Sequence, residues 1–417
     1  MAVRSRRACR GLPVLAVVLA ASTLVAACGS STSDGARGST AAGGSAGADG
    51  GSVSSPLGST INVGTIGAFS GALAASGDPI RDAVLAWSKS VNNGGGINGH
   101  PVKVYVQDDK GDPAASVQAL RTLVESDHVV ALVGVFAQGT EQMWGDYLLA
   151  HNVPVVGGVQ ATSIWTTNPM YFGVSTGPAI KAQVYLLGPK AEGATKNFGM
   201  YCSEISQCAD VANETKSYAS KVGVDWVGSV AVSASAANYA PVCLQAKSSG
   251  ATAITAILPA SDFGRVAETC HQQGFDPIYA ANSASLTPNL LKSPYLNKMV
   301  TFLNSFPIDS PVAAKYTAAM QKYYPDDDLA TSQGQTGWTG GSLFQEALKG
   351  ISPSEPVSSQ TVLDGLNSIT NDDLGGLLPQ GITFRKGTPH PQMSCSFIAH
   401  VMDQKLVSDK KPLCSVD

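Results

Sequence analysis

The chain has 417 residues, of which 44% are hydrophobic and 14% are charged, and its formal net charge is −4. This length suffices for two domains of ordinary size. Beyond residue 60, basic residues are not clustered, so we expect no nucleic-acid partner.

The start of the chain has the layout of a secretory signal. Three arginines within residues 4–7 precede an apolar run over 12–27, and Cys28 follows two alanines. This ending resembles a bacterial lipobox, which implies that residues 1–27 are removed as a signal peptide and that Cys28 is acylated. The alternatives are an ordinary signal peptide with an incidental cysteine and an uncleaved anchor helix. The apolar run is short for a bilayer span of about 20 residues.

Residues 28–59 are predicted to form a disordered tether. After Cys28 this segment consists almost entirely of Gly, Ser, Ala, Thr and Asp. Such a composition buries too little apolar surface to offset the entropy of ordering the chain. We therefore expect the folded part to begin near Thr60 and to be held outside the cytoplasm at the cell membrane.

The first half of the folded part alternates strands and helices. Continuous apolar strands separated by amphipathic helices are typical of a parallel sheet that is covered on both faces. The strands are expected over 61–69, 102–108, 129–136 and 153–159. The helices between them are expected over 78–92, 113–126 and 140–150.

The same alternation resumes after residue 196 and predicts a second doubly wound sheet. Its strands are expected over 197–202, 228–232, 253–258 and 278–281, and its helices over 210–221, 239–248 and 263–273. The fold class is therefore α/β with two sheets.

Six cysteines are expected in the mature folded part. An even number in an oxidising compartment indicates disulfides, and six cysteines allow fifteen pairings. We favour the sequence neighbours, since each pair closes a loop within one supersecondary unit: Cys202 with Cys208, Cys243 with Cys270, and Cys395 with Cys414. Metal binding is the weaker alternative, because no CxxC occurs and the six histidines are scattered. We expect neither a metal nor a cofactor.

Several segments together resemble the periplasmic leucine/isoleucine/valine-binding protein family, the type I solute receptors of ABC importers. They occur in the family's order over essentially the whole mature chain, at 61–87, 97–134, 151–158, 171–177 and 381–391. The resemblance implies a type I periplasmic-binding-protein fold, in which two Rossmann-like lobes are joined by three crossovers and hold a ligand in the cleft between them.

The lobe boundaries follow from this expectation. The N-terminal lobe is predicted over 60–176 and 305–375, and the C-terminal lobe over 177–304 and 376–417. The hinge is therefore expected near residues 175–177, 304–305 and 375–376.

Ligands of open α/β sheets bind outside the carboxyl ends of the strands. The loops expected there are rich in small residues that expose backbone N–H groups and hydroxyls, which suit a carboxylate. The resemblance implies that loops after the third and fourth strands hold the ligand. The matching first-lobe positions are Ser70, Ser76, Phe136, Ala137, Gln138, Val159 and Ala161, and those of the second lobe are Cys208, Ala260 and Asn282.

Two departures from the family pattern bear on the ligand. Phe136 begins the loop where family members place Ser and Thr, and no carboxylate stands at the second-lobe positions, although Glu204 and Asp262 lie close in sequence. A buried ammonium without a counter-charge is costly. We therefore predict a ligand with an anionic or neutral polar head and an apolar body that touches Phe136. Trp144 and Trp165 could add an aromatic wall, although a tryptophan within a helix is more often core.

Catalysis is not expected. No GxxxxGK[ST] loop occurs, and the glycine run at 94–96 follows a helix and indicates a helix end. The aspartates at 108–109 and 326–328 are interpreted as a strand end and a solvated turn. The leading hypothesis is a lipid-anchored receptor that closes on a small solute and presents it to an ABC permease. The alternatives are a ligand-sensing module for a signalling partner and an inert surface lipoprotein.

Overall fold

The computed structural model describes residues 58–416, except 205, 283–286, 304, 328, 330, 331 and 410. The predicted signal peptide, Cys28 and nearly all of the predicted tether lie outside the described residues. Within the described part of the chain, no helix combines the length and the apolar character that crossing a bilayer requires.

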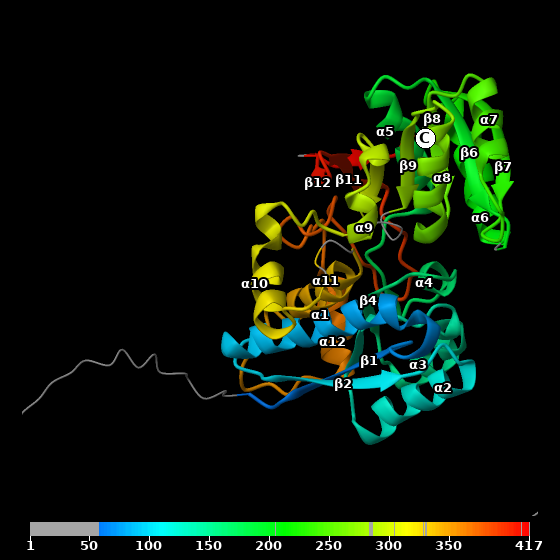
Figure 1. Cartoon of the computed structure of the whole chain (residues 1–417). Coiled ribbons are helices and arrows are strands. Elements are labelled where there is room, and N and C mark those ends of the chain that lie inside the picture. Colours follow the sequence, from blue (N-terminus) through cyan, green and yellow to red (C-terminus); the bar gives the residue numbers. More distant parts are fainter. Residues whose placement is uncertain are drawn as a thin grey trace, which may run out of the picture. The chain divides into compact units, whose positions relative to one another are not determined.

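A first parallel sheet of five strands forms within the described residues, in the order β2-β1-β3-β4-β5 (Figure 1). Its strands are β1 (Ile61–Gly67), β2 (Val102–Asp108), β3 (Ala131–Val135), β4 (Val155–Gly158) and β5 (Tyr171–Phe172). Every residue of β3 and β4 is buried, as expected for central strands covered by helices on both faces. The four predicted strands of this sheet are confirmed, and the short β5 is an addition.

A second sheet has the order β12-β11-β10-β9-β8-β6-β7, and β13 pairs with β11. Its parallel strands are β6 (Lys196–Cys202), β7 (Asp225–Val232), β8 (Ala253–Ile257), β9 (Ile278–Asn282) and β10 (Val300–Leu303). Its antiparallel extension consists of β11 (Cys395–Met402), β12 (Lys405–Ser408) and β13 (Leu413–Cys414). The sequence analysis predicted β6 to β9 and did not predict the other four.

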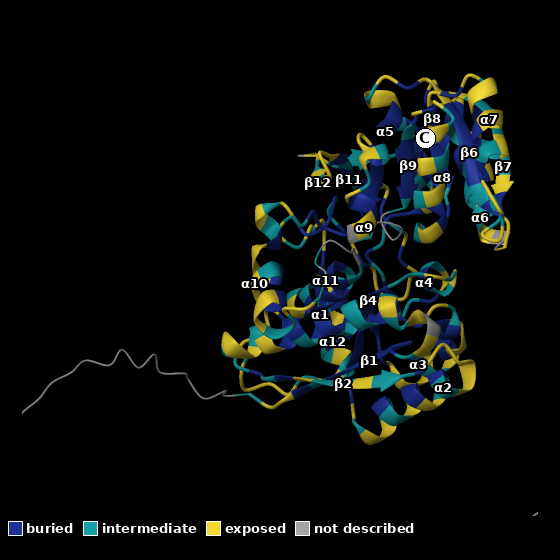
Figure 2. Cartoon of the chain, in the orientation of Figure 1, coloured by how far each residue is buried: buried dark blue, intermediate teal, exposed yellow. Residues whose placement is uncertain are grey.

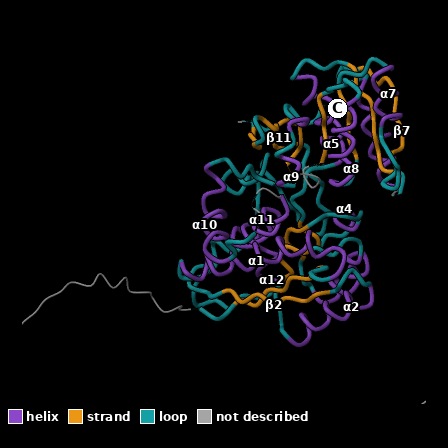
Figure 3. The backbone as a smooth tube through the Cα atoms, viewed as in Figure 1, coloured by secondary structure: helices purple, strands orange, loops and turns teal. Residues whose placement is uncertain are grey.

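Helices flank the strands of both sheets (Figure 3). Those of the first lobe are α1 (Ala74–Asn93), α2 (Pro113–Arg121), α3 (Gly145–His151), α4 (Ile164–Thr167), α10 (Ala314–Tyr323), α11 (Ser332–Ala347) and α12 (Ser359–Ser368). Those of the second lobe are α5 (Pro178–Ala191), α6 (Ser206–Ala219), α7 (Ala240–Ser248), α8 (Ala260–Gln272) and α9 (Pro288–Leu291). Short 3-10 helices occur at η1 (Gly71–Leu73), η3 (Thr140–Trp144), η5 (Pro294–Leu296) and η6 (Pro311–Ala313), and a π-helical turn at η2 (Thr122–Ser126).

The core of the first lobe depends on α11, which comes late in the chain. Helix α11 packs against α1 and against the central strands β3 and β4. This close approach requires glycine, because a Cβ at Gly340 would lie 3.1 Å from the backbone nitrogen of Gly134. Trp87 and Phe344 meet edge to face across the two helices, with ring centroids 6.1 Å apart. Trp87 and Trp338 are both buried in this core. Figure 2 shows buried residues along the strands and on one side of the helices.

The chain passes between the two lobes along neighbouring segments. The Met393 N–H donates to the Ser175 carbonyl at 3.0 Å, and the Gly177 N–H donates to the Met393 carbonyl at 2.8 Å. Residues 175–177, where the first crossing is predicted, therefore run beside Met393. The second crossing is predicted at 304–305, directly after β10, and Asn304 lies outside the described residues.

The third crossing comes later in the chain than the predicted 375–376. Leu377, Leu378, Ile382 and Phe384 still pack in the core of the first lobe. The glycine pair at 375–376 forms a turn, with φ of 70° and 88°. The prediction of a hinge at 375–376 is therefore wrong, because these glycines form a turn within the first lobe. The hydrogen bonds of Met393 with Ser175 and Gly177 indicate that the third crossing lies near Met393.

Three disulfides are present among the described residues, and they join the predicted neighbours. Cys202–Cys208 links the end of β6 to α6, and Cys243–Cys270 links α7 to α8. Cys395–Cys414 joins β11 to β13 at the end of the chain. Each bridge therefore closes a loop within one supersecondary unit.

Candidate functional site

A cavity of about 710 Å³ lies at the carboxyl ends of strands from both sheets. We call it the site cavity. The first lobe contributes the segment that follows β4, and the second lobe contributes the ends of β6, β8, β9 and β10 with the faces of α5 and α6. Its lining residues are Gln160, Ala161, Thr162, Ser163, Thr166, Pro178, Lys181, Ala182, Tyr185, Cys202, Gln207, Cys208, Asp210, Val211, Glu214, Ile257, Leu258, Pro259, Asn282, Phe302 and Gln392. Strand ends of open α/β sheets are where ligands ordinarily bind.

Three of the ten predicted ligand-binding residues line this cavity: Ala161, Cys208 and Asn282. Ala260 begins α8 directly after the lining residue Pro259. The other predicted positions are not among the residues that line it, and they remain predictions for a ligand-bound form. They are Ser70, Ser76, Phe136, Ala137, Gln138 and Val159.

Phe136 is buried, with an exposed fraction of 1%. It packs in a small cluster with Ala68, Phe69 and Ile80, beside the partly buried Val159. A Cβ at Gly77 would lie 3.0 Å from the Phe136 ring, so the start of α1 also confines this side chain. Phe136 therefore supports the loop after β3 from inside the first lobe.

Ser70 and Ser76 flank η1 and are both partly exposed. Asp108, which ends β2, accepts hydrogen bonds from the backbone N–H groups of Phe69 and Lys110 at 2.9 and 3.0 Å. Burial alone would raise the pKa of Asp108, but hydrogen bonds from Ser70 and these N–H groups outweigh it and lower the pKa. The Asp108 carboxylate thus holds the first loop in place.

The loop after β3 has a strained turn. Gln138 is exposed and has φ of 46°, in the left-handed region, and Gly139 follows with φ of 108°. The Thr140 hydroxyl and backbone N–H both donate to the Ala137 carbonyl, at 2.8 and 3.0 Å. Ala137 itself is buried. In this turn Gln138 is therefore exposed to solvent, whereas Ala137 is buried.

A chain of buried hydrogen bonds braces this loop. The Thr140 hydroxyl lies 2.9 Å from Asp109 Oδ2 and 2.9 Å from the Ser116 hydroxyl. The Ser116 oxygen also accepts a hydrogen bond from Trp144 Nε1 at 3.1 Å. Trp144 is completely buried, and Trp165 packs in the same cluster. Both tryptophans are therefore core residues in this structure.

Gln160 joins the cavity wall to the first crossover. Its amide oxygen accepts hydrogen bonds from the backbone N–H groups of Val174 and Ser175, both at 2.8 Å. Its side chain packs on Gly173, where a Cβ would come within 2.1 Å of it. The absence of a side chain at Gly173 therefore allows Gln160 to reach the crossover.

Residues 173–177 have the GxSxG spacing of a hydrolase nucleophile elbow, so the interpretation that the sequence contains no such pattern is wrong. In an elbow the serine stands at a sharp turn between strand and helix. Here Ser175 and Thr176 lie in a segment that pairs with Met393, and Gly177 is extended, with ψ of 162°. Ser175 is therefore part of the crossover and has no elbow geometry.

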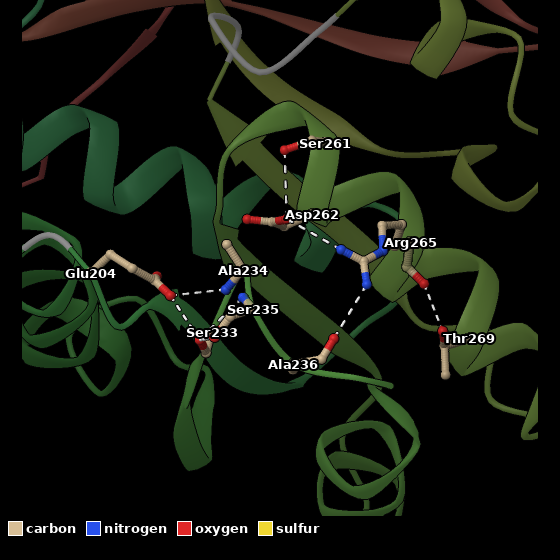
Figure 4. Close-up of polar contacts among 9 residues, drawn as sticks. All are labelled: Glu204, Ser233, Ala234, Ser235, Ala236, Ser261, Asp262, Arg265 and Thr269. Carbon is tan, nitrogen blue, oxygen red and sulfur yellow. Dashed lines mark hydrogen bonds and ion pairs between the residues drawn. The ribbon is translucent and has the colours of Figure 1, made fainter. Parts of the chain in front are cut away.

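Carboxylates at the second-lobe strand ends are already engaged with protein groups (Figure 4). Glu204 accepts hydrogen bonds from the Ser233 hydroxyl at 2.8 Å and the Ala234 N–H at 2.9 Å. Asp262 is only 4% exposed and lies 3.9 Å from the Arg265 guanidinium. Both carboxylates are therefore engaged with protein groups.

Arg265 is fixed by two further contacts. Its Nη2 donates to the Ala236 carbonyl at 3.3 Å, and its guanidinium lies 4.8 Å from the centroid of the Tyr239 ring. Burial raises the pKa of the Tyr239 hydroxyl, and the nearby Asp262 carboxylate raises it further. The group that Figure 4 shows is therefore a structural brace between the loop after β7 and the start of α8.

The site cavity itself contains charged side chains that the sequence analysis missed. Lys181, on the first turn of α5, and Glu214, on α6, both line it. The Lys181 ammonium lies 5.4 Å from the centroid of the Phe302 ring. Burial lowers the pKa of Lys181 to about 8, against the opposing effect of Glu214. Burial raises the pKa of Glu214, and here Lys181 opposes the shift.

Two doubly wound sheets that share a cavity at their strand ends define the class of type I solute-binding folds. Solved proteins of this class have the same fold. The branched-chain amino acid transporter substrate binding protein LivJ from Streptococcus pneumoniae, solved with isoleucine, has a TM-score of 0.66 at 15% identity. That alignment covers 85% of this chain and 99% of LivJ.

A second solved relative has a different ligand in its name. The fatty acid ABC transporter substrate-binding protein from Thermomonospora curvata has a TM-score of 0.65 at 16% identity, over 86% of this chain and 93% of that protein. Since both likenesses are remote in sequence, they show the fold alone.

Residues 60–405 match the family model described as periplasmic binding protein, so the chain belongs to that family. The resemblance to leucine/isoleucine/valine-binding proteins is thereby confirmed. An amino acid binding protein from Pseudomonas aeruginosa is 28% identical over 109 residues, or 26% of this chain. The match spans 28% of that curated relative. Periplasmic binding proteins are solute-binding proteins that act outside the cytoplasm.

Proposed function

We propose that this chain is a lipid-anchored solute-binding protein of an ABC importer and has no catalytic activity. It binds a small amino-acid-like, carboxylate or amide solute in the site cavity and delivers it to a permease in the membrane. The observation that carries the proposal is the site cavity, which is lined from both lobes at the carboxyl ends of their strands.

The composition of the cavity supports a solute with both polar and apolar parts. Its apolar lining includes Tyr185, Leu258 and Phe302, and its polar lining includes Gln207 and Gln392. Apolar walls combined with polar groups are the usual arrangement for binding and orienting a small molecule. A volume of about 710 Å³ is within the usual range for such sites.

Anchoring would keep this binding site next to the permease. The lipobox-like run that ends at Cys28 and the Gly/Ser/Ala-rich segment after it support the proposal. Two or three acyl chains hold a protein firmly at a membrane, and a flexible segment leaves the folded part free to meet both solute and permease.

The test begins with native mass spectrometry of the purified mature protein to identify any solute that co-purifies. Calorimetric titration then measures its affinity for wild type and for Ala161→Trp, which fills the cavity. Ala191→Trp is the matched control, since Ala191 is exposed at the end of α5 and does not line the cavity. We expect only Ala161→Trp to lose binding. Equal affinity in all three proteins would contradict the site.

Transport is tested separately from binding. Uptake of the same labelled solute is measured in cells that lack the chain and in cells that carry it with its permease. Restored uptake supports the importer role. Full binding without any effect on uptake would instead favour a sensing module.

A further inference from the structure

Lys181 is the one cationic side chain among the described residues that line the site cavity. It is partly buried, and its ammonium is near the Phe302 ring. An aromatic face attracts a cation, but it does not neutralise the charge. The position thus brings a positive charge to a cavity whose other charged lining residues, Asp210 and Glu214, are acidic.

The Lys181 ammonium has no protein counter-ion in direct contact. No carboxylate in the described part of the chain lies within 4.0 Å of it. Glu214 and Asp210 also line the cavity, and Glu214 affects Lys181 only at longer range. A desolvated cation without a direct partner is costly, so an entering anion would be favoured.

The location of Lys181 on its helix adds to this preference. Lys181 stands in the first turn of α5, a helix of 14 residues whose cap, Gly177, has no side chain. The start of a helix carries partial positive charge, which disfavours a lysine and favours an anion. The helix and the ammonium therefore attract negative charge to the same part of the cavity.

The wall beyond Lys181 is apolar. Ala182, Tyr185, Val211, Leu258 and Phe302 line the cavity, and Phe302 lies next to Lys181. An acid with a hydrocarbon body would place its carboxylate at Lys181 and its apolar part along these side chains. A zwitterion would also need a carboxylate for its ammonium. Glu204 and Asp262 are engaged with protein groups and do not line the cavity. Of the two carboxylates that do line it, Asp210 is exposed to solvent and Glu214 is the longer-range counter-charge of Lys181.

We propose that Lys181 binds the carboxylate of the solute, and that the solute is an organic acid with an apolar body and no ammonium group. This inference rests on the proposed function, because it assigns the ligand class of the same cavity. Glu214 is then a distant counter-charge for Lys181.

The experiment titrates wild type, Lys181→Met, Lys181→Arg and Glu214→Gln at pH 7 with octanoate, phenylacetate, octanamide and leucine. We expect both carboxylates to bind wild type and to bind Lys181→Met about 100-fold more weakly, as for other truncated charge pairs. Lys181→Arg should retain most of the affinity, since it keeps the charge. Octanamide should bind wild type and Lys181→Met equally, and thermal unfolding confirms that each variant is folded.

Several results would overturn the inference. Equal binding of the carboxylates by wild type and Lys181→Met would remove Lys181 from recognition. Tighter binding of leucine, lost in Glu214→Gln, would show that the pair holds a zwitterion. Binding of a co-purified solute but of neither carboxylate would refute the ligand class and leave the proposed function standing. If wild type binds neither the panel nor any co-purified solute, both proposals fail.

Discussion

The buried carboxylate of Glu141 accepts a hydrogen bond from the Thr162 hydroxyl at 2.9 Å and another from the Gly139 N–H at 2.6 Å. Gly139 belongs to the loop after β3, and Thr162 belongs to the loop after β4 and lines the site cavity. One side chain therefore fixes the two first-lobe loops that the family resemblance assigns to ligand binding. The Tyr171 hydroxyl further fixes the position of Glu141 by donating a hydrogen bond to its backbone carbonyl at 2.7 Å.

Glu141→Ala should destabilise the protein by about 2–4 kcal/mol, because it leaves partly buried donors on both loops without their acceptor. Asp146→Ala is the matched control, since Asp146 is an exposed acid on the following helix. Its effect should be within about 0.5 kcal/mol. Urea unfolding of both variants measures the difference. Similar stabilities of the two would show that Glu141 does not join the loops.

His390 should make the protein less stable in mild acid. Its ring is buried, with centroids 4.5 Å from Phe172 and 4.7 Å from Phe384. Burial lowers the pKa of His390 to about 4, although a hydrogen bond to the Pro169 backbone opposes the shift. Between pH 6.5 and 4 the unfolded chain therefore binds more protons than the folded one. Stability should be full above pH 6.5 and fall by about 3 kcal/mol as the pH reaches 4.

The control for this prediction is His390→Phe, which keeps an aromatic ring between Phe172 and Phe384 and removes the titrating group. Urea unfolding at several pH values should show a smaller loss of stability in this variant between pH 6.5 and 4. Parallel pH profiles of the variant and wild type would assign the acid sensitivity to other groups.

Periodicity predicted most of the fold because its strands are continuous apolar runs and its helices have one apolar face. β3 and α1 are examples, since every residue of β3 is buried and α1 buries Ile80, Ala83 and Val84 on one side. The alternation of strands and helices did not predict the elements after residue 300. There α11 is rich in small residues, and its packing on Gly134 and Gly157 is visible only in three dimensions.

The site was less predictable, since a cavity joins side chains that are far apart in the sequence. Lys181 follows the crossover and looks like an ordinary surface lysine, yet the fold places it opposite Phe302, more than a hundred residues later. Phe136 shows the opposite relation. Its place at a strand end predicts ligand contact, and in this structure its side chain packs against Ala68 and Ile80 inside the first lobe. Neither contact leaves a local signal in the sequence.

The six cysteines of the described part should contain no free thiol. Alkylation of the unreduced, denatured protein should add no mass, and alkylation after reduction should modify all six. Peptide mapping without reduction should recover the three neighbouring pairs. Two or more reactive thiols before reduction would contradict the three bridges.

Cys28→Ala should release the protein from membranes or block its maturation. Acylation requires the cysteine thiol, and without acyl chains only a weak or uncleaved attachment remains. Fractionation of cells followed by intact-mass measurement of the membrane pool checks this. Cys9→Ala is the matched control, because Cys9 precedes the apolar run and should not affect anchoring. Unchanged membrane retention of a mature Cys28→Ala protein would rule out the lipid anchor.

Lys181→Met should make the ligand-free protein more stable. Burial holds the pKa of Lys181 at about 8, against 10.5 in the unfolded chain, so the folded state bears the cost of a desolvated charge below pH 8. Methionine has a similar length without the charge. At pH 7 the variant should gain about 1–3 kcal/mol. Thermal and urea unfolding without ligand measure this gain.

The stability that Lys181→Met gains over wild type should decrease as the pH rises. From pH 8 to 10.5 the unfolded wild-type chain binds more protons than the folded one, so wild type becomes more stable as the pH rises. The advantage of Lys181→Met should therefore be full below pH 8 and shrink toward pH 10.5. Two other groups that line the cavity are shifted by burial, which raises the pKa of Glu214 against the effect of Lys181 and raises the pKa of Tyr185. If the variant were less stable than wild type at pH 7, protein contacts would already stabilise the Lys181 ammonium. This result would contradict its role as a binding group for an anionic solute.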